Sequence, residues 1–194
     1  MKKYVAEALG AAALTLAVGF SFAGTFPVST PVLAALTLAL FVYSIGHISG
    51  THINPAVTIG AWSIKKISTE DAIGYLIAQF FGAAIALAVI SSTVGMPSLA
   101  VSNSVMTGVA ELVGTFFFAF GIASVVYGKT PSQLSGVVVG GSLLLGIAMS
   151  VFLGAAGLLN PAVALGIGSF NLMYILGPII GSVLGMQAYK YLRD

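Results

Sequence analysis

The stretch GHISGTHINPAVTIG, residues 46–60, interrupts an apolar run with polar and helix-breaking residues. A second stretch, GAAGLLNPAVALGIG at residues 154–168, carries the same Asn-Pro-Ala core. Asn is a favoured N-cap and Pro a favoured first helical residue, so each core predicts the start of a helix. The apolar pieces that follow, 55–64 and 161–169, are only half as long as a membrane-spanning helix. The two cores therefore predict two half-length helices.

The composition of the chain excludes a soluble globular protein. Of its 194 residues, 58% are hydrophobic and only 6% are charged, and the mean hydropathy is +1.08. Too few charged groups exist to cover a water-exposed surface, which predicts a polytopic membrane protein in contact with lipid. The chain has no cysteine, so it has no disulfide or thiolate metal site. Its net charge of +2 is small and no basic run is present, which argues against a nucleic-acid partner.

Six apolar runs are long enough to cross the membrane, since crossing about 30 Å of hydrocarbon takes roughly 20 helical residues. They are 4–23, 31–50, 70–92, 104–127, 133–153 and 171–191. The first run is too long for a secretory signal and contains Glu7, so we expect it to be retained. With six spans, every basic residue falls on one side of the membrane: Lys2, Lys3, Lys65, Lys66, Lys129, Lys190 and Arg193. By the positive-inside rule that side is cytoplasmic, and both termini lie there.

The chain also contains an internal repeat. The segments AEALG at 6–10 and AELVG at 110–114 each open a long run, and the paired glutamates and paired asparagines have nearly the same separation. A single transmembrane domain over 1–194 is thus expected to consist of two halves, 1–100 and 101–194. Each half has three spans, so the second half crosses the membrane in the inverted direction and the two half-helices meet near the midplane.

The paired interruptions predict a pore. Irregular backbone is tolerated at membrane depth only inside protein or beside a wet cavity. Two helix N-termini aimed at one point repel cations, and amide donors orient water, so the arrangement favours neutral solutes. The residues of the two cores are Asn54, Pro55, Ala56, Asn160, Pro161 and Ala162. The backbone carbonyls expected to line the path are those of Gly50, Thr51, His52, Ala156, Gly157 and Leu158.

These motifs resemble the aquaporin and glycerol-facilitator family, the major intrinsic proteins. The resemblance covers the whole chain and includes Gln79 and the Gly177-Pro178 pair. It implies an all-α membrane protein with six transmembrane helices and two re-entrant half-helices. It also implies one pore per subunit and a homotetramer. Glu7 and Glu111 would stabilise the two interrupted segments on the side away from the pore, by accepting hydrogen bonds from their backbone N–H groups.

The chain departs from the family at the outer constriction. Family members usually place Arg directly after the second Asn-Pro-Ala, where this chain has Val163. The family's usual intervals put Ala34 at the helix 2 position and Ala148 at the helix 5 position, with Ile147 or Met149 as alternatives. The Arg-Asp pair of many glycerol facilitators is also missing. The resemblance therefore implies an apolar selectivity filter of Ala34, Ala148, Gly157 and Val163.

The main functional hypothesis is a passive channel for water and small uncharged solutes such as glycerol, urea, ammonia or dissolved gases, in the cell membrane. One alternative is an ion-coupled secondary transporter, although Glu7, Glu111 and two histidines are its only candidate intramembrane ionisable groups. Another is a structural membrane protein with a closed pore. No nucleophile–base pair, metal cluster or phosphate loop is present, so the sequence predicts neither an enzyme, nor a metal site, nor a cofactor.

Overall fold

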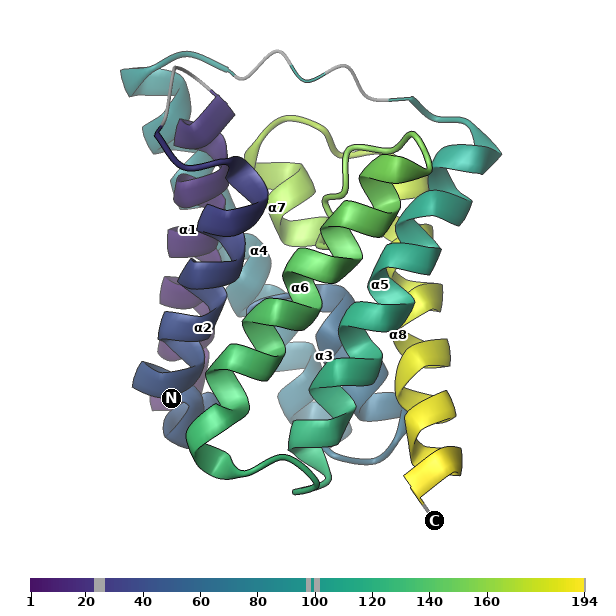
Figure 1. Ribbon diagram of the computed structural model, residues 1–194. Helices are drawn as coiled ribbons and strands as arrows, with labels where there is room; N and C mark the ends of the chain where they lie inside the picture. Colours follow the sequence, from purple (N-terminus) through teal and green to yellow (C-terminus); the bar gives the residue numbers. More distant parts are fainter. Residues whose placement is uncertain (23–26, 97–98, 100–101, 194) are drawn as a thin grey trace.

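The computed structural model describes residues 1–22, 27–96, 99 and 102–193, and this part of the chain is helical with no strand (Figure 1). The helices are α1 (Lys2–Phe22), α2 (Thr30–Ser49), α3 (Pro55–Ser63), α4 (Thr69–Thr93), α5 (Val105–Val126), α6 (Ser135–Phe152), α7 (Pro161–Gly166) and α8 (Met173–Arg193), with a 3-10 turn at Ser132–Leu134 before α6. The predicted all-α class is confirmed.

The six long helices agree with the predicted spans, because their ends differ from the predictions by only one or two residues. Five of them, α1, α2, α4, α5 and α6, are long and apolar enough to cross a membrane. Helix α8 has 21 residues but is less apolar, since its last turns carry Gln187, Lys190 and Arg193.

The second half-helix is shorter than predicted. The expected segment was 161–169, but α7 ends at Gly166. The reason is a tight turn at Gly168, which takes a positive φ of 72°. The N–H of Ser169 then donates to the carbonyl of Ala164 at 2.8 Å, which closes the helix end.

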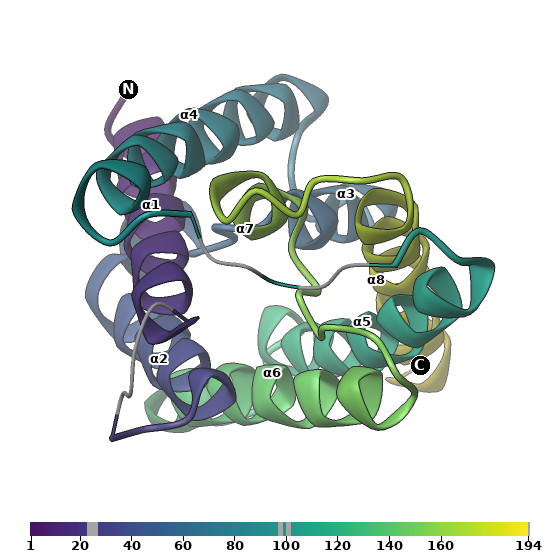
Figure 2. The same ribbon diagram turned by 90° about the horizontal axis from the view of Figure 1, so that it is seen from above.

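The two short helices lie between α4 and α8 and complete the ring of long helices there (Figure 2). Helix α1 packs against α4, and α5 packs against α8. Each half-helix packs mainly on a long helix far from it in sequence, α3 on α8 and α7 on α4. The N-termini of α3 and α7 therefore face each other near the middle of the bundle. The predicted boundary at 100/101 lies outside the described residues.

Close packing of α8 on α5 depends on a glycine at every fourth residue. A Cβ on Gly181 would lie 2.3 Å from the carbonyl oxygen of Leu112, and one on Gly185 would lie 2.2 Å from that of Phe116. A Cβ on Gly177 would lie 2.5 Å from the carbonyl oxygen of Gly108. Small residues allow such backbone contact between helices in lipid, where burial of apolar surface provides no driving force.

Gly181→Ala is expected to destabilise the protein by about 1–3 kcal/mol, because α8 must move away from α5 to accept the methyl group. Thermal unfolding of the detergent-solubilised protein measures this as a lower midpoint. Gly141→Ala is the matched control, since a Cβ at Gly141 meets nothing within 4 Å. Equal midpoints for the two variants would contradict the assigned contact.

Candidate functional site

The two Asn-Pro-Ala cores meet through their asparagines. The Asn54 side-chain oxygen accepts from the N–H of Ala56 at 2.8 Å, and its amide nitrogen donates to the carbonyl of Leu159 at 2.9 Å. Asn160 does the same in reverse, capping α7 at the Ala162 N–H and donating to the carbonyl of Ile53 at 3.0 Å. Each asparagine thus starts its own helix and holds the opposite segment. One of the two amide hydrogens of each side chain is left for another acceptor.

Pro55 and Pro161 occupy the first helical position of α3 and α7. They are buried together with Ala56 and Ala162, and none of the four lines the cavities described below. The proline ring presets the helical φ and removes a backbone donor that would have no partner at a helix start. These residues fix the directions of the two half-helices, and the asparagines line the distal cavity.

Glu111 is fully buried and accepts four hydrogen bonds. The backbone N–H groups of Gly157 and Leu158 donate to one oxygen at 2.8 and 3.1 Å, and that of Leu159 donates to the other at 2.7 Å. The fourth donor is the Ser150 hydroxyl at 2.9 Å. A carboxylate in lipid is costly unless donors surround it, and the segment before Asn160 supplies them.

Glu7 is placed in the same way behind the first core. It accepts from the N–H groups of His52 and Ile53 at 2.9 and 2.6 Å and from the Ser49 hydroxyl at 2.6 Å. Its fourth donor is the side-chain amide of Gln79 at 2.7 Å. The two glutamates therefore play equivalent structural parts in the two halves of the bundle.

The hydrogen bonds to the glutamates determine where the carbonyls point. A trans peptide directs its N–H and its C=O to opposite sides. The peptides that donate to Glu7 and Glu111 therefore turn their carbonyl oxygens away from the glutamates and toward the cavities. These carbonyls belong to Thr51, His52, Ala156, Gly157 and Leu158, and none of them accepts a hydrogen bond within the described part of the chain. They form two rows of carbonyl oxygens that can accept hydrogen bonds from a solute.

Three residues in these segments have a left-handed backbone that sequence reasoning missed. Thr51, Ile53 and Leu159 have φ values of 52°, 40° and 51°. Side chains disfavour this region, at a cost of about 1–2 kcal/mol per residue. No sequence signal marks them, because the usual signal is glycine or asparagine. The bonds to the glutamates and between the two cores offset that cost.

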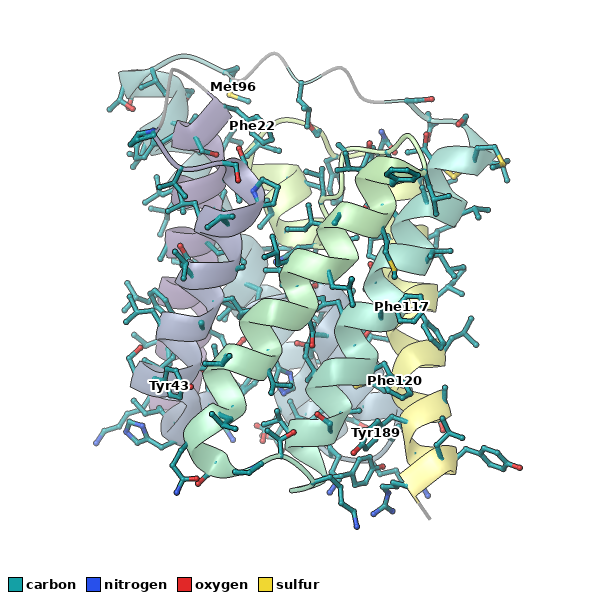
Figure 3. All side chains as sticks on the ribbon, viewed as in Figure 1. Phe22, Tyr43, Met96, Phe117, Phe120 and Tyr189 are labelled. Carbon is teal, nitrogen blue, oxygen red and sulfur yellow. The ribbon has the colours of Figure 1, made fainter. Side chains whose placement is uncertain are left out.

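Two cavities lie end to end inside the bundle, and the asparagines line one of them. The distal cavity, of about 180 Å³, opens on the side away from both termini. Phe22, labelled near the top of Figure 3, lies at its rim. The terminal-side cavity, of about 430 Å³, opens on the side of both termini. Both are lined by Leu38, His52 and Phe118, which we call the waist.

The predicted lining residues are divided between these cavities. The distal cavity is lined by Asn54, Asn160, Ala34, Ala156, Gly157, Leu158 and Val163. The terminal-side cavity is lined by Gly50 and Thr51, and His52 lines both. No Asp, Glu, Lys or Arg side chain is among the described residues that line the distal cavity. The described residues also contain no group of His, Cys, Asp and Glu side chains suited to hold a metal ion.

Ala148 does not line either cavity, so the predicted helix 5 position was wrong. Ala148 is exposed on the outside of α6, whereas Ile147 is only 7% exposed. The α6 residues that line the distal cavity are Leu143, Ile147 and Val151, spaced at four residues along one helix face. Ile147 also lies beside Gly157, where an added Cβ would be 3.0 Å from its Cγ2. Ala34, Ile147, Gly157 and Val163 therefore line the distal cavity together, with Ile147 in the place predicted for Ala148.

Comparisons with known proteins agree with this geometry. A sequence model of the family described as "MIP: Major intrinsic protein" matches residues 1–189. The chain is 32% identical over 181 residues to Aquaporin AqpM of Methanothermobacter thermautotrophicus, covering 81% of this chain and 73% of that one. It is 29% identical over 229 residues to Aquaporin Z of Bradyrhizobium diazoefficiens, covering 100% and 94%.

Among solved structures, the X-ray structure of the aquaglyceroporin from Plasmodium falciparum superposes with a TM-score of 0.77 at 22% identity. The match covers 99% of this chain and 96% of that one, and it shows a shared fold. Because the family match extends over almost the whole sequence, the chain belongs to the major intrinsic protein family.

Proposed function

We propose that this protein is a passive membrane channel for water and small neutral solutes, and not an enzyme. The observation that carries the proposal is a pair of cavities that share Leu38, His52 and Phe118. Asn54 and Asn160 line the distal one, and carbonyls without a hydrogen-bond partner belong to residues that line each cavity. A solute that enters either cavity meets acceptors along the wall and two amide donors at the centre. The family and the relatives named as aquaporins support the same function.

The centre of the path favours neutral solutes. The N-termini of α3 and α7 both face this point, and each contributes about half a positive charge. That charge opposes cations. A water molecule that accepts hydrogen bonds from both asparagines must turn its own hydrogens outward, which interrupts a chain of waters for proton transfer.

The constriction of Ala34, Ile147, Gly157 and Val163 extends the range of solutes. It offers no side-chain donor, so water gains little there in exchange for its lost hydrogen bonds. Larger or less polar neutral solutes lose less. We therefore infer that glycerol, urea, ammonia and dissolved gases pass in addition to water.

The family and the charge distribution support a proposal for the arrangement in the membrane. We infer a homotetramer, as the resemblance implies, with one path per subunit and a division of each subunit into the halves 1–100 and 101–194. The basic residues gather at the helix ends on the side of both termini, and by the positive-inside rule this supports a cytoplasmic location for those ends. The protein then lies as a multi-pass protein in the cell membrane.

Stopped-flow light scattering of proteoliposomes tests the function. Water and at least one of the neutral solutes should cross faster than in protein-free vesicles. A well-folded tetramer that passes none of them would instead support a closed-pore structural protein. Accumulation of a solute against its gradient would support an ion-coupled transporter.

Ile147→Phe is expected to lower glycerol permeability by roughly tenfold, because the added ring fills part of the narrow distal cavity. The same assay measures it. Ala148→Phe is the matched control, since the neighbouring residue faces outward from α6 and should leave glycerol permeability unchanged. A larger effect at 148 than at 147 would restore the original assignment of the constriction.

A further inference from the structure

The terminal-side cavity contains a lysine for which the proposed pore gives no role. Lys66, in the turn between α3 and α4, lines this cavity, and its ammonium nitrogen lies 4.4 Å from the centre of the Tyr127 ring at the end of α5. The cation–π contact thus holds the ammonium at the edge of this cavity, on the side of Tyr127, which does not itself line the cavity. We call this edge the terminal-side mouth. Tyr127 also stacks on Tyr189 of α8, labelled at the lower end of Figure 3, with ring centres 6.1 Å apart.

The backbone before Lys66 turns the chain back toward the mouth. Lys65 has a left-handed φ of 61°, and the N–H of Lys66 donates to the carbonyl of Ala61 at 2.9 Å. The equivalent turn after α7 places glycine, Gly168, in the left-handed position. A lysine there is strained, and strained backbone that persists suggests a functional constraint. Lys65 itself is exposed and lines neither cavity.

The other charged group in this cavity is neutralised. Asp71 also lines it, but its carboxylate lies 2.6 Å from the ammonium of Lys3 and accepts a hydrogen bond from the Tyr4 hydroxyl at 2.9 Å. Among the described lining residues, Lys66 therefore determines the charge of the mouth. The guanidinium of Arg193 lies 3.8 Å from the centre of the same Tyr127 ring.

We propose that Lys66 is a specificity-determining residue that excludes cations at the terminal-side mouth. This inference rests on the proposed channel function. The distal constriction has Val163 where an arginine would oppose cations, so the barrier there is weak. A positive charge fixed at the opposite mouth lowers the local cation concentration without narrowing the path for neutral solutes. Tyr127 positions this charge.

Currents through planar bilayers under a KCl gradient, with water and glycerol fluxes in proteoliposomes from the same preparation, test the proposal. Lys66→Gln should raise K⁺ permeability about tenfold at low ionic strength, because a unit positive charge is removed from a residue that lines the cavity. The difference from wild type should shrink in 1 M salt, where the screening length is about 3 Å. Glycerol and water fluxes should stay unchanged.

Two variants separate this role from a structural one. Lys66→Arg keeps the charge and the contact with Tyr127, and should behave as wild type. Lys65→Gln removes the same charge from the adjacent residue and should not raise K⁺ permeability. The proposal would be overturned if Lys66→Gln has the K⁺ permeability of wild type, which includes the case in which neither protein carries a current. It would also be overturned if Lys65→Gln raises K⁺ permeability as much as Lys66→Gln does. Loss of neutral-solute flux in the wild type would instead overturn the channel function.

Discussion

Val163→Arg is expected to lower glycerol and urea permeability by at least about tenfold and to reduce K⁺ leak, while water still passes. Val163 is the third residue of α7, is 3% exposed and lines the distal cavity. An arginine there adds five N–H donors and a fixed charge to a constriction that has neither. The donors offer water hydrogen-bond partners, the bulk excludes larger solutes, and the charge repels cations. Stopped-flow measurements and bilayer currents give all three values.

Val163→Met is the control, because it adds a long side chain without charge or N–H donors. It should reduce glycerol and urea permeability and leave K⁺ leak at the wild-type level. If Val163→Arg and Val163→Met act alike on K⁺, bulk alone explains the effect. If Val163→Arg changes neither the solutes nor K⁺, the constriction that selects solutes lies elsewhere, and the waist of Leu38, His52 and Phe118 becomes its natural location.

Most of the fold could be predicted because a membrane restricts the alternatives. Every backbone group must find a partner in lipid, so long apolar runs can only be helices, and interruptions such as Asn54-Pro55 must be buried or beside a cavity. The same reasoning applies to Glu111, since a buried carboxylate needs several donors nearby. The structure supplies them from the backbone of residues 157–159. These features could be predicted because an unpaired backbone group or charge in lipid is costly, so each such residue must have partners nearby.

The unpredicted features depend on fractions of a helical turn or on single dihedral angles. Ile147 and Ala148 differ by about 100° around α6, so an error of one residue in the loop before Asn160 moves the assignment from the cavity to the outside. The left-handed backbone of Ile53 and Leu159 follows from bonds to distant glutamates, which local sequence does not encode. The position of Lys66 likewise depends on the strained turn at Lys65. Each needs three-dimensional context.

Glu111→Gln is expected to abolish most water and glycerol permeability. The carboxylate accepts hydrogen bonds from three backbone N–H groups and from the Ser150 hydroxyl. A hydrogen-bond donor at this position would therefore face other donors. A glutamine turns its NH₂ toward these donors and leaves at least one buried N–H without a partner, which costs about 1–3 kcal/mol, with further loss from removing a charged acceptor. The left-handed backbone of Leu159 then loses its hydrogen bond to the carboxylate. Asn160, the next residue, is no longer held in position. Proteoliposome fluxes measure the result.

Glu70→Gln is the matched control, because Glu70 lies exposed in the first turn of α4 and should tolerate the same change. Circular dichroism separates local from global damage: retained helix with lost flux means that the segment 156–160 alone has rearranged. In that case the carbonyls of Gly157 and Leu158 no longer face the distal cavity, since their direction was fixed by N–H groups that pointed at the carboxylate. Normal flux in Glu111→Gln would mean that the direct contact between Asn54 and Leu159 holds this segment without the glutamate.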